Sequence, residues 1–101
     1  MMRFSREYRK LKENIFTTIR KNSKGVYDVG RFKKVVTPKQ EFGAYIIGSR
    51  PLKKAEITEE LAQSDADCSR VELIKKLDGW YGKDFDDFVL LTLERNGGGD
   101  G

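Results

Sequence analysis

Apolar and polar residues alternate along residues 15–20, and most of these positions carry β-branched or aromatic side chains. This two-residue period is typical of a β-strand. Phe16, Thr18 and Arg20 then share one face of the strand, while Ile15 and its alternate neighbours share the other. A basic loop follows. An arginine at such a strand end is well placed to donate two parallel hydrogen bonds to a phosphate or a base edge, and equally to remain a solvated charge.

Further strands are expected in the first half of the chain. Residues 31–36 form a basic strand, Pro38 lies in a turn, and residues 41–47 return as an apolar strand, which gives an antiparallel hairpin. Residues 26–30 are expected to be a short extended piece that ends in a turn. Gly48 and Pro51 break the second strand of the hairpin, and a bulge could let residues 52–55 extend it.

A basic helix is expected before the first strand. Ser5 has the character of an N-cap, and Asn14 is a plausible end of the helix. Tyr8 and Leu11 form its narrow apolar face. Its basic side chains, Lys10 among them, are expected around the solvated remainder of its surface.

The second half of the chain is mainly helical. Thr58 is the N-cap of a short helix that ends near residues 64–65, and Ser69 and Glu72 have the spacing of a capping box at the start of a second helix. Glycines at 79 and 82 end this second helix. Its predicted apolar stripe consists of Val71, Leu73, Ile74, Leu77, Trp80 and Tyr81. We expect Trp80 and Tyr81 to lie in the core rather than to serve as stacking platforms.

Residues 88–93 are almost continuously apolar, which is typical of a strand buried on both faces. The order of elements therefore predicts one α+β domain over residues 1–95. Its sheet would be a small mixed or antiparallel β-barrel, or a curled sheet, of about five to six strands with two to three flanking helices. Residues 96–101 are expected to be a flexible glycine-rich tail.

Composition narrows the chemistry. The 101 residues are 38% hydrophobic and 36% charged, and no apolar run is long enough to span a membrane or to form a secretory signal. Cys68 is the only cysteine, so an intramolecular disulfide is excluded and a cytoplasmic location is the simplest expectation. The absence of histidine removes the usual general base and the commonest transition-metal ligand. We therefore expect no metal and no cofactor.

Charge is distributed unevenly. Residues 1–54 contain 15 Lys and Arg against 4 Asp and Glu, whereas residues 55–101 contain 5 against 12. Such asymmetry indicates an anionic partner for the basic half. The alternative is that the two halves neutralise each other in the fold.

The strand at residues 15–20, the segment Tyr27-Asp28-Val29-Gly30 and the late helix followed by residues 88–95 together resemble the ASCH domain family. This family belongs to the PUA-like β-barrel superfamily, and the resemblance spans residues 4–95. It implies a PUA-like barrel that binds RNA in a cleft between barrel and helix.

Small ASCH proteins of similar length include amidohydrolases that act on N4-acetylcytidine with a lysine, a threonine and a glutamate. The family segment runs Gly-x-Lys-x-x-(Glu or Thr)-x-Arg. Thr18 and Arg20 match it, but Glu13 holds the glycine position and Ile15 the lysine position. The resemblance carries Thr18 and Glu72 over as catalytic candidates. The lysine is missing, although Lys12 or Lys21 could approach from nearby.

The resemblance and the basic pattern together predict an RNA- or nucleotide-binding module. Arg20, Lys21 and Lys24, with Lys33 and Lys34 on the neighbouring strand, would form one basic rim, and Tyr27 would stack on a base. An amidohydrolase on a modified nucleoside is the alternative. A third possibility is a protein-interaction module for an acidic partner. The sequence leaves the oligomeric state open, with a monomer as the simplest expectation.

Overall fold

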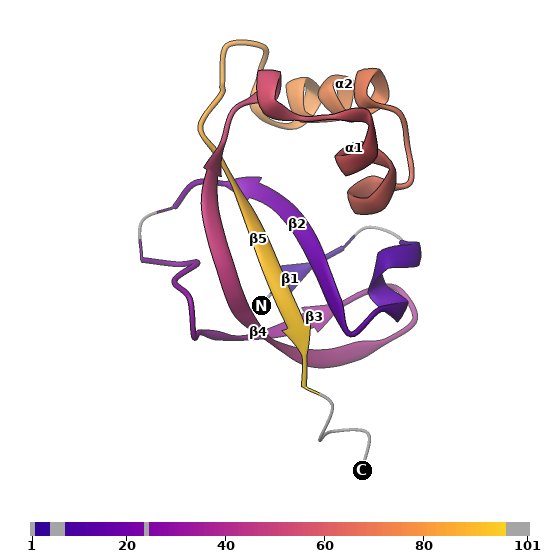
Figure 1. Cartoon of the computed structure of the whole chain (residues 1–101), viewed down its shortest axis with the longest axis vertical. Coiled ribbons are helices and arrows are strands. Elements are labelled where there is room, and N and C mark those ends of the chain that lie inside the picture. Colours follow the sequence, from indigo (N-terminus) through magenta and orange to yellow (C-terminus); the bar gives the residue numbers. More distant parts are fainter. Residues whose placement is uncertain (1, 5–7, 24, 97–101) are drawn as a thin grey trace.

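The structure is a computed structural model that describes residues 2–4, 8–23 and 25–96 (Figure 1). It is an α+β fold in which two helices lie at one end of a strongly curled sheet. The elements in chain order are β1 (Met2–Arg3), η1 (Arg9–Lys12), β2 (Ile15–Lys21), β3 (Phe32–Val36), β4 (Glu41–Leu52), η2 (Lys54–Glu56), α1 (Glu59–Ala66), α2 (Arg70–Tyr81) and β5 (Phe88–Arg95). The predicted fold class, a small curled sheet with flanking helices, is confirmed.

The five strands form one sheet in the order β1-β3-β4-β5-β2. β1 pairs with β3 in parallel, and all other pairs are antiparallel, including the predicted β3–β4 hairpin. β1 and β2 are the two edges. No backbone ladder joins them among the described residues, so the curled sheet is a half-barrel with an open seam.

β5 lies in the interior of the sheet and is buried on both faces, as its sequence predicts. Val89, Leu91 and Leu93 belong to a core inside the curl of the sheet. Phe88 and Leu90 belong to a second core, which the helices cover. One strand therefore joins the barrel to the helical layer.

The prediction of an N-terminal helix is wrong. The short strand β1 comes first among the described residues, and of those described before β2 only 9–12 are helical, as a single 3-10 turn. Ser5, the predicted N-cap, lies outside the described residues. Leu11 is fully buried as expected, but Lys10 is buried too, although we predicted it in solvent.

Two further boundaries differ from the prediction. Residues 26–30 are turns rather than an extended piece, and Gly30 has a φ of 95°. β4 passes through Gly48 and Pro51 as far as Leu52, with a shift of register between Ile46 and Gly48. Pro51 is tolerated because β4 pairs with β3 only as far as Tyr45, so that its later part has β5 as its one ladder neighbour and is an edge.

The capping predictions for the two helices of the second half are confirmed. Thr58 accepts a hydrogen bond from the backbone of Leu61, and Ser69 and Glu72 form a capping box. α2 continues through Gly79, however, and ends at Tyr81. No helix in the described part of the chain is long and apolar enough to cross a membrane.

Candidate nucleotide-binding cleft

A cleft of about 320 Å³ lies where the edge strand β2 faces α2. That volume is at the small end of the range for ligand pockets. The residues that line it come from the N-terminal segment, β2 and the two helices. They are Arg3, Phe4, Tyr8, Lys10, Thr18, Ile19, Arg20, Asp65, Ala66, Leu73, Lys76, Leu77, Trp80 and Tyr81.

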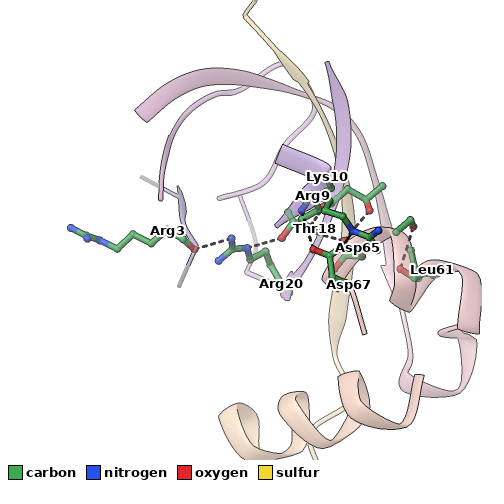
Figure 2. Close-up of polar contacts among 10 residues, drawn as sticks. Arg3, Arg9, Lys10, Thr18, Arg20, Leu61, Asp65 and Asp67 are labelled. Carbon is green, nitrogen blue, oxygen red and sulfur yellow. Dashed lines mark hydrogen bonds and ion pairs between the residues drawn. The ribbon is translucent and has the colours of Figure 1, made fainter. Parts of the chain in front are cut away.

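Arg20 spans the open seam of the half-barrel (Figure 2). Its Nη2 donates to the backbone carbonyl of Arg3 at 3.1 Å, and its Nε donates to Oγ1 of Thr18 at 3.2 Å. The guanidinium carbon lies 4.8 Å from the centre of the Phe4 ring. These contacts hold the guanidinium across the gap between the two edge strands and fix its direction.

The remaining nitrogen of Arg20 is available to a ligand. Nη1 is hydrogen-bonded to none of the residues that the structure describes. Burial lowers the pKa of the Arg20 guanidinium from its ordinary value, but arginine stays protonated at neutral pH. The cleft therefore contains a fixed and partly dehydrated positive charge, which attracts an anion more strongly than a surface lysine does.

Lys10 and Asp65 form a buried ion pair on the wall of the same cleft. Nζ of Lys10 lies 3.2 Å from Oδ1 of Asp65, and the two side chains are 6% and 7% exposed. The ammonium also donates to the backbone carbonyl of Thr17 at 2.6 Å, and the hydroxyl of Thr17 donates to Asp65 at 2.9 Å. Through these contacts with Thr17 the pair connects α1 to the edge of β2; Lys10 and Asp65 are labelled in Figure 2.

Burial lowers the pKa of the Lys10 ammonium, and the attraction of Asp65 opposes this effect only in part. Arg20 adds a repulsive contribution from the same cleft. Desolvation therefore outweighs the ion pair at Lys10. The cleft holds a lysine that gives up its proton more readily than a surface lysine.

Positive charge exceeds negative charge along the lining. Lys10, Arg20 and Lys76 line the cleft with cationic side chains, and Asp65, the one carboxylate, is already paired with Lys10. Arg3 lines it too, but its side chain points away from Arg20 (Figure 2), so the positive excess consists of Arg20 and Lys76. Two tyrosines and a tryptophan line the same space: Tyr8, Tyr81 and Trp80. Cations beside aromatic faces suit a ligand that combines an anionic group with a flat ring.

The two predicted catalytic residues, Thr18 and Glu72, lie apart. Thr18 is buried in the cleft, as expected for the face it shares with Arg20. Glu72 is exposed at the start of α2, where its carboxylate accepts from the backbone and hydroxyl of Ser69. It does not line the cleft. Ile15, at the position of the missing family lysine, is half exposed.

The predicted basic rim is spread over the sheet. β3 is not the neighbour of β2, because β2 pairs with β5, so the expected adjacency is wrong. Lys21 lies over the Phe85 ring, and Lys33 lies over the half-buried Tyr27 ring. Lys34 is paired with Glu41 at 2.9 Å. None of these lines the cleft, and Lys24 lies outside the described residues.

The two oppositely charged halves of the chain also meet in the fold. Ion pairs join Arg9 to Asp67, Lys10 to Asp65 and Lys54 to Asp78. The basic excess of the first half is therefore neutralised in part, and the excess that remains in the cleft comes from specific side chains. No group of three or more metal-ligating side chains occurs within the described ranges.

Sequence reasoning missed Lys10, Asp65 and Trp80. Lys10 stands in a basic segment that reads as solvated, and only its contact with Asp65, 55 residues away, makes its burial possible. Trp80 lies at helical spacing from Leu73 and Leu77 but at the margin of their stripe. The sequence held one signal for the site: Trp80 lies at the edge of the predicted apolar face, one helical turn after Lys76.

Comparisons with family models, with curated proteins and with solved structures found no match to this chain.

Proposed function

We propose that this domain binds nucleotides or single-stranded RNA in the cleft between β2 and α2. The observation that carries the proposal is the partly buried guanidinium of Arg20, which is fixed across the seam with Nη1 directed to no protein acceptor in the described chain. A phosphate oxygen is a suitable acceptor for that nitrogen. The aromatic rings beside it supply the surface for a base.

Duplex nucleic acid fits this site poorly. The bases of a duplex are stacked on one another and do not reach the faces of aromatic side chains, whereas unpaired bases can be splayed onto them. The cleft is also narrow enough for roughly one nucleotide unit rather than for a groove that follows a helix. We infer a preference for unpaired nucleotides.

The test is a titration of the protein into a fluorescently labelled single-stranded RNA, followed by anisotropy at low salt and at about 0.2 M salt. Lys76→Gln removes one cleft cation, and Lys75→Gln removes the exposed neighbouring charge outside the cleft. We expect Lys76→Gln and Arg20→Gln to weaken binding by about tenfold and Lys75→Gln to change it little. Affinity should also fall at higher salt, because phosphate contacts release counterions.

Equal effects of Lys75→Gln and Lys76→Gln would contradict a specific role for the cleft. Absence of binding at low salt would overturn the proposal itself. Arg20→Gln removes the contact with the Arg3 carbonyl as well as the charge, so its fold is checked by circular dichroism. The other cleft variant, Lys76→Gln, keeps the test decisive if Arg20→Gln proves unstable.

A second function, an amidohydrolase on a modified nucleoside, has one observation in its favour. Lys10 supplies the cleft with a lysine of lowered pKa beside Thr18, although Ile15 occupies the position where the ASCH pattern has its lysine. A neutral amine could take the proton of a threonine hydroxyl. In the structure, however, Lys10 donates to Thr17 and Asp65, and the Thr18 hydroxyl accepts from Arg20.

The two functions are separated by turnover. Incubation with N4-acetylcytidine, followed by chromatography of the nucleosides, should show no conversion to cytidine if the cleft only binds. Conversion that disappears in Thr18→Val and in Lys10→Met, under conditions in which circular dichroism shows both variants folded, would establish the hydrolase. Thr92→Val, on the neighbouring strand β5 and outside the cleft, is the control for the effect of removing a threonine hydroxyl.

A further inference from the structure

Trp80 stands out among the side chains of the cleft. It is the only tryptophan in the chain, and it is 61% exposed although it lines the cleft. α2 is anchored by Leu73 and Leu77, which are almost fully buried. The attachment of this helix to the core therefore does not depend on the indole.

The position of Trp80 on α2 places it beside a cation. Lys76 precedes it by one helical turn, so both side chains lie on neighbouring parts of the same helix face, and both line the cleft. Arg20 reaches the same space from β2. A ring face from one residue and positive charge from two others thus converge from two separate elements of the fold.

An exposed apolar side chain by itself is common and needs no function. Here the exposed residue also lines a concave, cation-rich cleft. Tryptophan offers the largest aromatic face of any side chain and pairs a flat apolar body with one N–H donor. These properties match the face of a nucleobase better than they match an aliphatic or a purely anionic ligand.

We propose that Trp80 is the stacking platform for one unpaired nucleobase, whose phosphate is held by Arg20 and Lys76. This inference rests on the proposed nucleotide-binding function and names the part of the ligand that the cleft selects. The ligand class is a nucleotide unit that carries its base. Phosphate or sugar phosphate without a base should bind more weakly, and pairing of the base should abolish the stacking contact.

The sole tryptophan makes this inference directly measurable. We would titrate the protein with a short oligoadenylate RNA and record tryptophan fluorescence, with calorimetry in parallel. A matched oligomer of abasic units tests the base, and hybridisation to oligouridylate tests the need for an unpaired strand. We expect the oligoadenylate to quench Trp80 and the other two ligands to leave its emission nearly unchanged.

Variants divide the contribution of the ring from that of the charge. Trp80→Leu should weaken oligoadenylate binding by roughly 5- to 100-fold, which corresponds to the loss of one base–aromatic contact. The same change should leave the weak binding of the abasic oligomer unaltered. Trp80→Phe should retain part of the affinity. Val71→Ala, which shortens an exposed apolar side chain on the same helix outside the cleft, is the control and should have no effect.

The outcomes also separate this inference from the proposed function. Calorimetric binding of oligoadenylate without any change in fluorescence, and with equal affinity for Trp80→Leu, would overturn the stacking role while nucleotide binding stands. An equal loss of affinity for the base-containing and abasic oligomers in Trp80→Leu would also overturn it, because the ring would then be only structural. Absence of calorimetric binding by the unmodified protein would refute both.

Discussion

The buried pair of Lys10 and Asp65 should be strongly coupled, and this prediction can be worked out from its geometry. The two charges lie 3.2 Å apart, and less than a tenth of either side chain is exposed. With an effective dielectric constant of about 20, their attraction is about 5 kcal/mol. Burial costs a similar amount, so the pair as a whole should contribute little to stability.

Removal of one partner is a different matter, because it leaves the other charge buried without compensation. We expect Lys10→Met and Asp65→Asn each to lower the free energy of unfolding by about 3–5 kcal/mol. The double variant removes both charges and keeps an amide that can still bond to Thr17. Its free energy of unfolding should be close to that of the unmodified protein. The coupling energy of the cycle then equals the sum of the two single losses, about 6–10 kcal/mol.

The assay is urea unfolding of the four proteins, followed by circular dichroism. Lys34 and Glu41 provide the control cycle, with an ion pair that is shorter, at 2.9 Å, but with side chains that are 55% and 59% exposed. Solvent screening should keep the coupling of that pair below about 1 kcal/mol. If the effects of Lys10→Met and Asp65→Asn were simply additive, the pair would not be buried and coupled as described, and the reasoning would be refuted.

Three further predictions concern separate features. Burial lowers the pKa of Lys10, so at alkaline pH between the lowered pKa and the ordinary one the unfolded chain holds a proton that the native protein lacks. In that pH range the free energy of unfolding of the unmodified protein, relative to that of Lys10→Met, should rise with pH. A difference in urea unfolding that stays constant with pH would contradict this. Gly43→Ala would place a methyl group 2.3 Å from the Phe32 ring, which is exposed and can swing away. Calorimetric melting should therefore show the free energy of unfolding lowered by only about 0.5–1.5 kcal/mol, the worth of one aromatic contact. If Gly43→Ala lowered it equally in a Phe32→Ala background, the clash with Phe32 would be excluded as the cause. Glu72→Gln keeps the capping box with Ser69, so ligand affinity and melting temperature should stay unchanged; a drop in nucleoside turnover would instead assign Glu72 a catalytic role.

Local patterns in the sequence were sufficient for much of the fold. The alternation around Phe16 and Thr18 identified β2 and its inner face, the Ser69–Glu72 spacing identified the start of α2, and the apolar run at residues 88–93 identified a doubly buried strand. Each of these features is set by neighbours in the chain or by burial of a whole element. Such features are visible in one sequence.

The site was less visible because it depends on contacts between distant segments. Lys10 is buried only because Asp65 on α1 lies against the edge of β2. Trp80 is exposed because α2 is anchored by Leu73 and Leu77 and presents its margin to the cleft. Arg20 was identified from its strand, yet its attachment to the Arg3 carbonyl follows from the open seam of the half-barrel, which no local pattern reveals.

The most direct measurement of the central claim is an amide-shift NMR titration of the labelled protein with a short single-stranded RNA at low salt. The account predicts shifts at the backbone amides of Thr18 and Arg20 and at the single indole N–H of Trp80, which move together and weaken as salt is added. Shifts confined to the far side of the sheet, around Lys33 and Lys34, would contradict the cleft as the binding site. No shifts at all would contradict nucleotide binding by this domain.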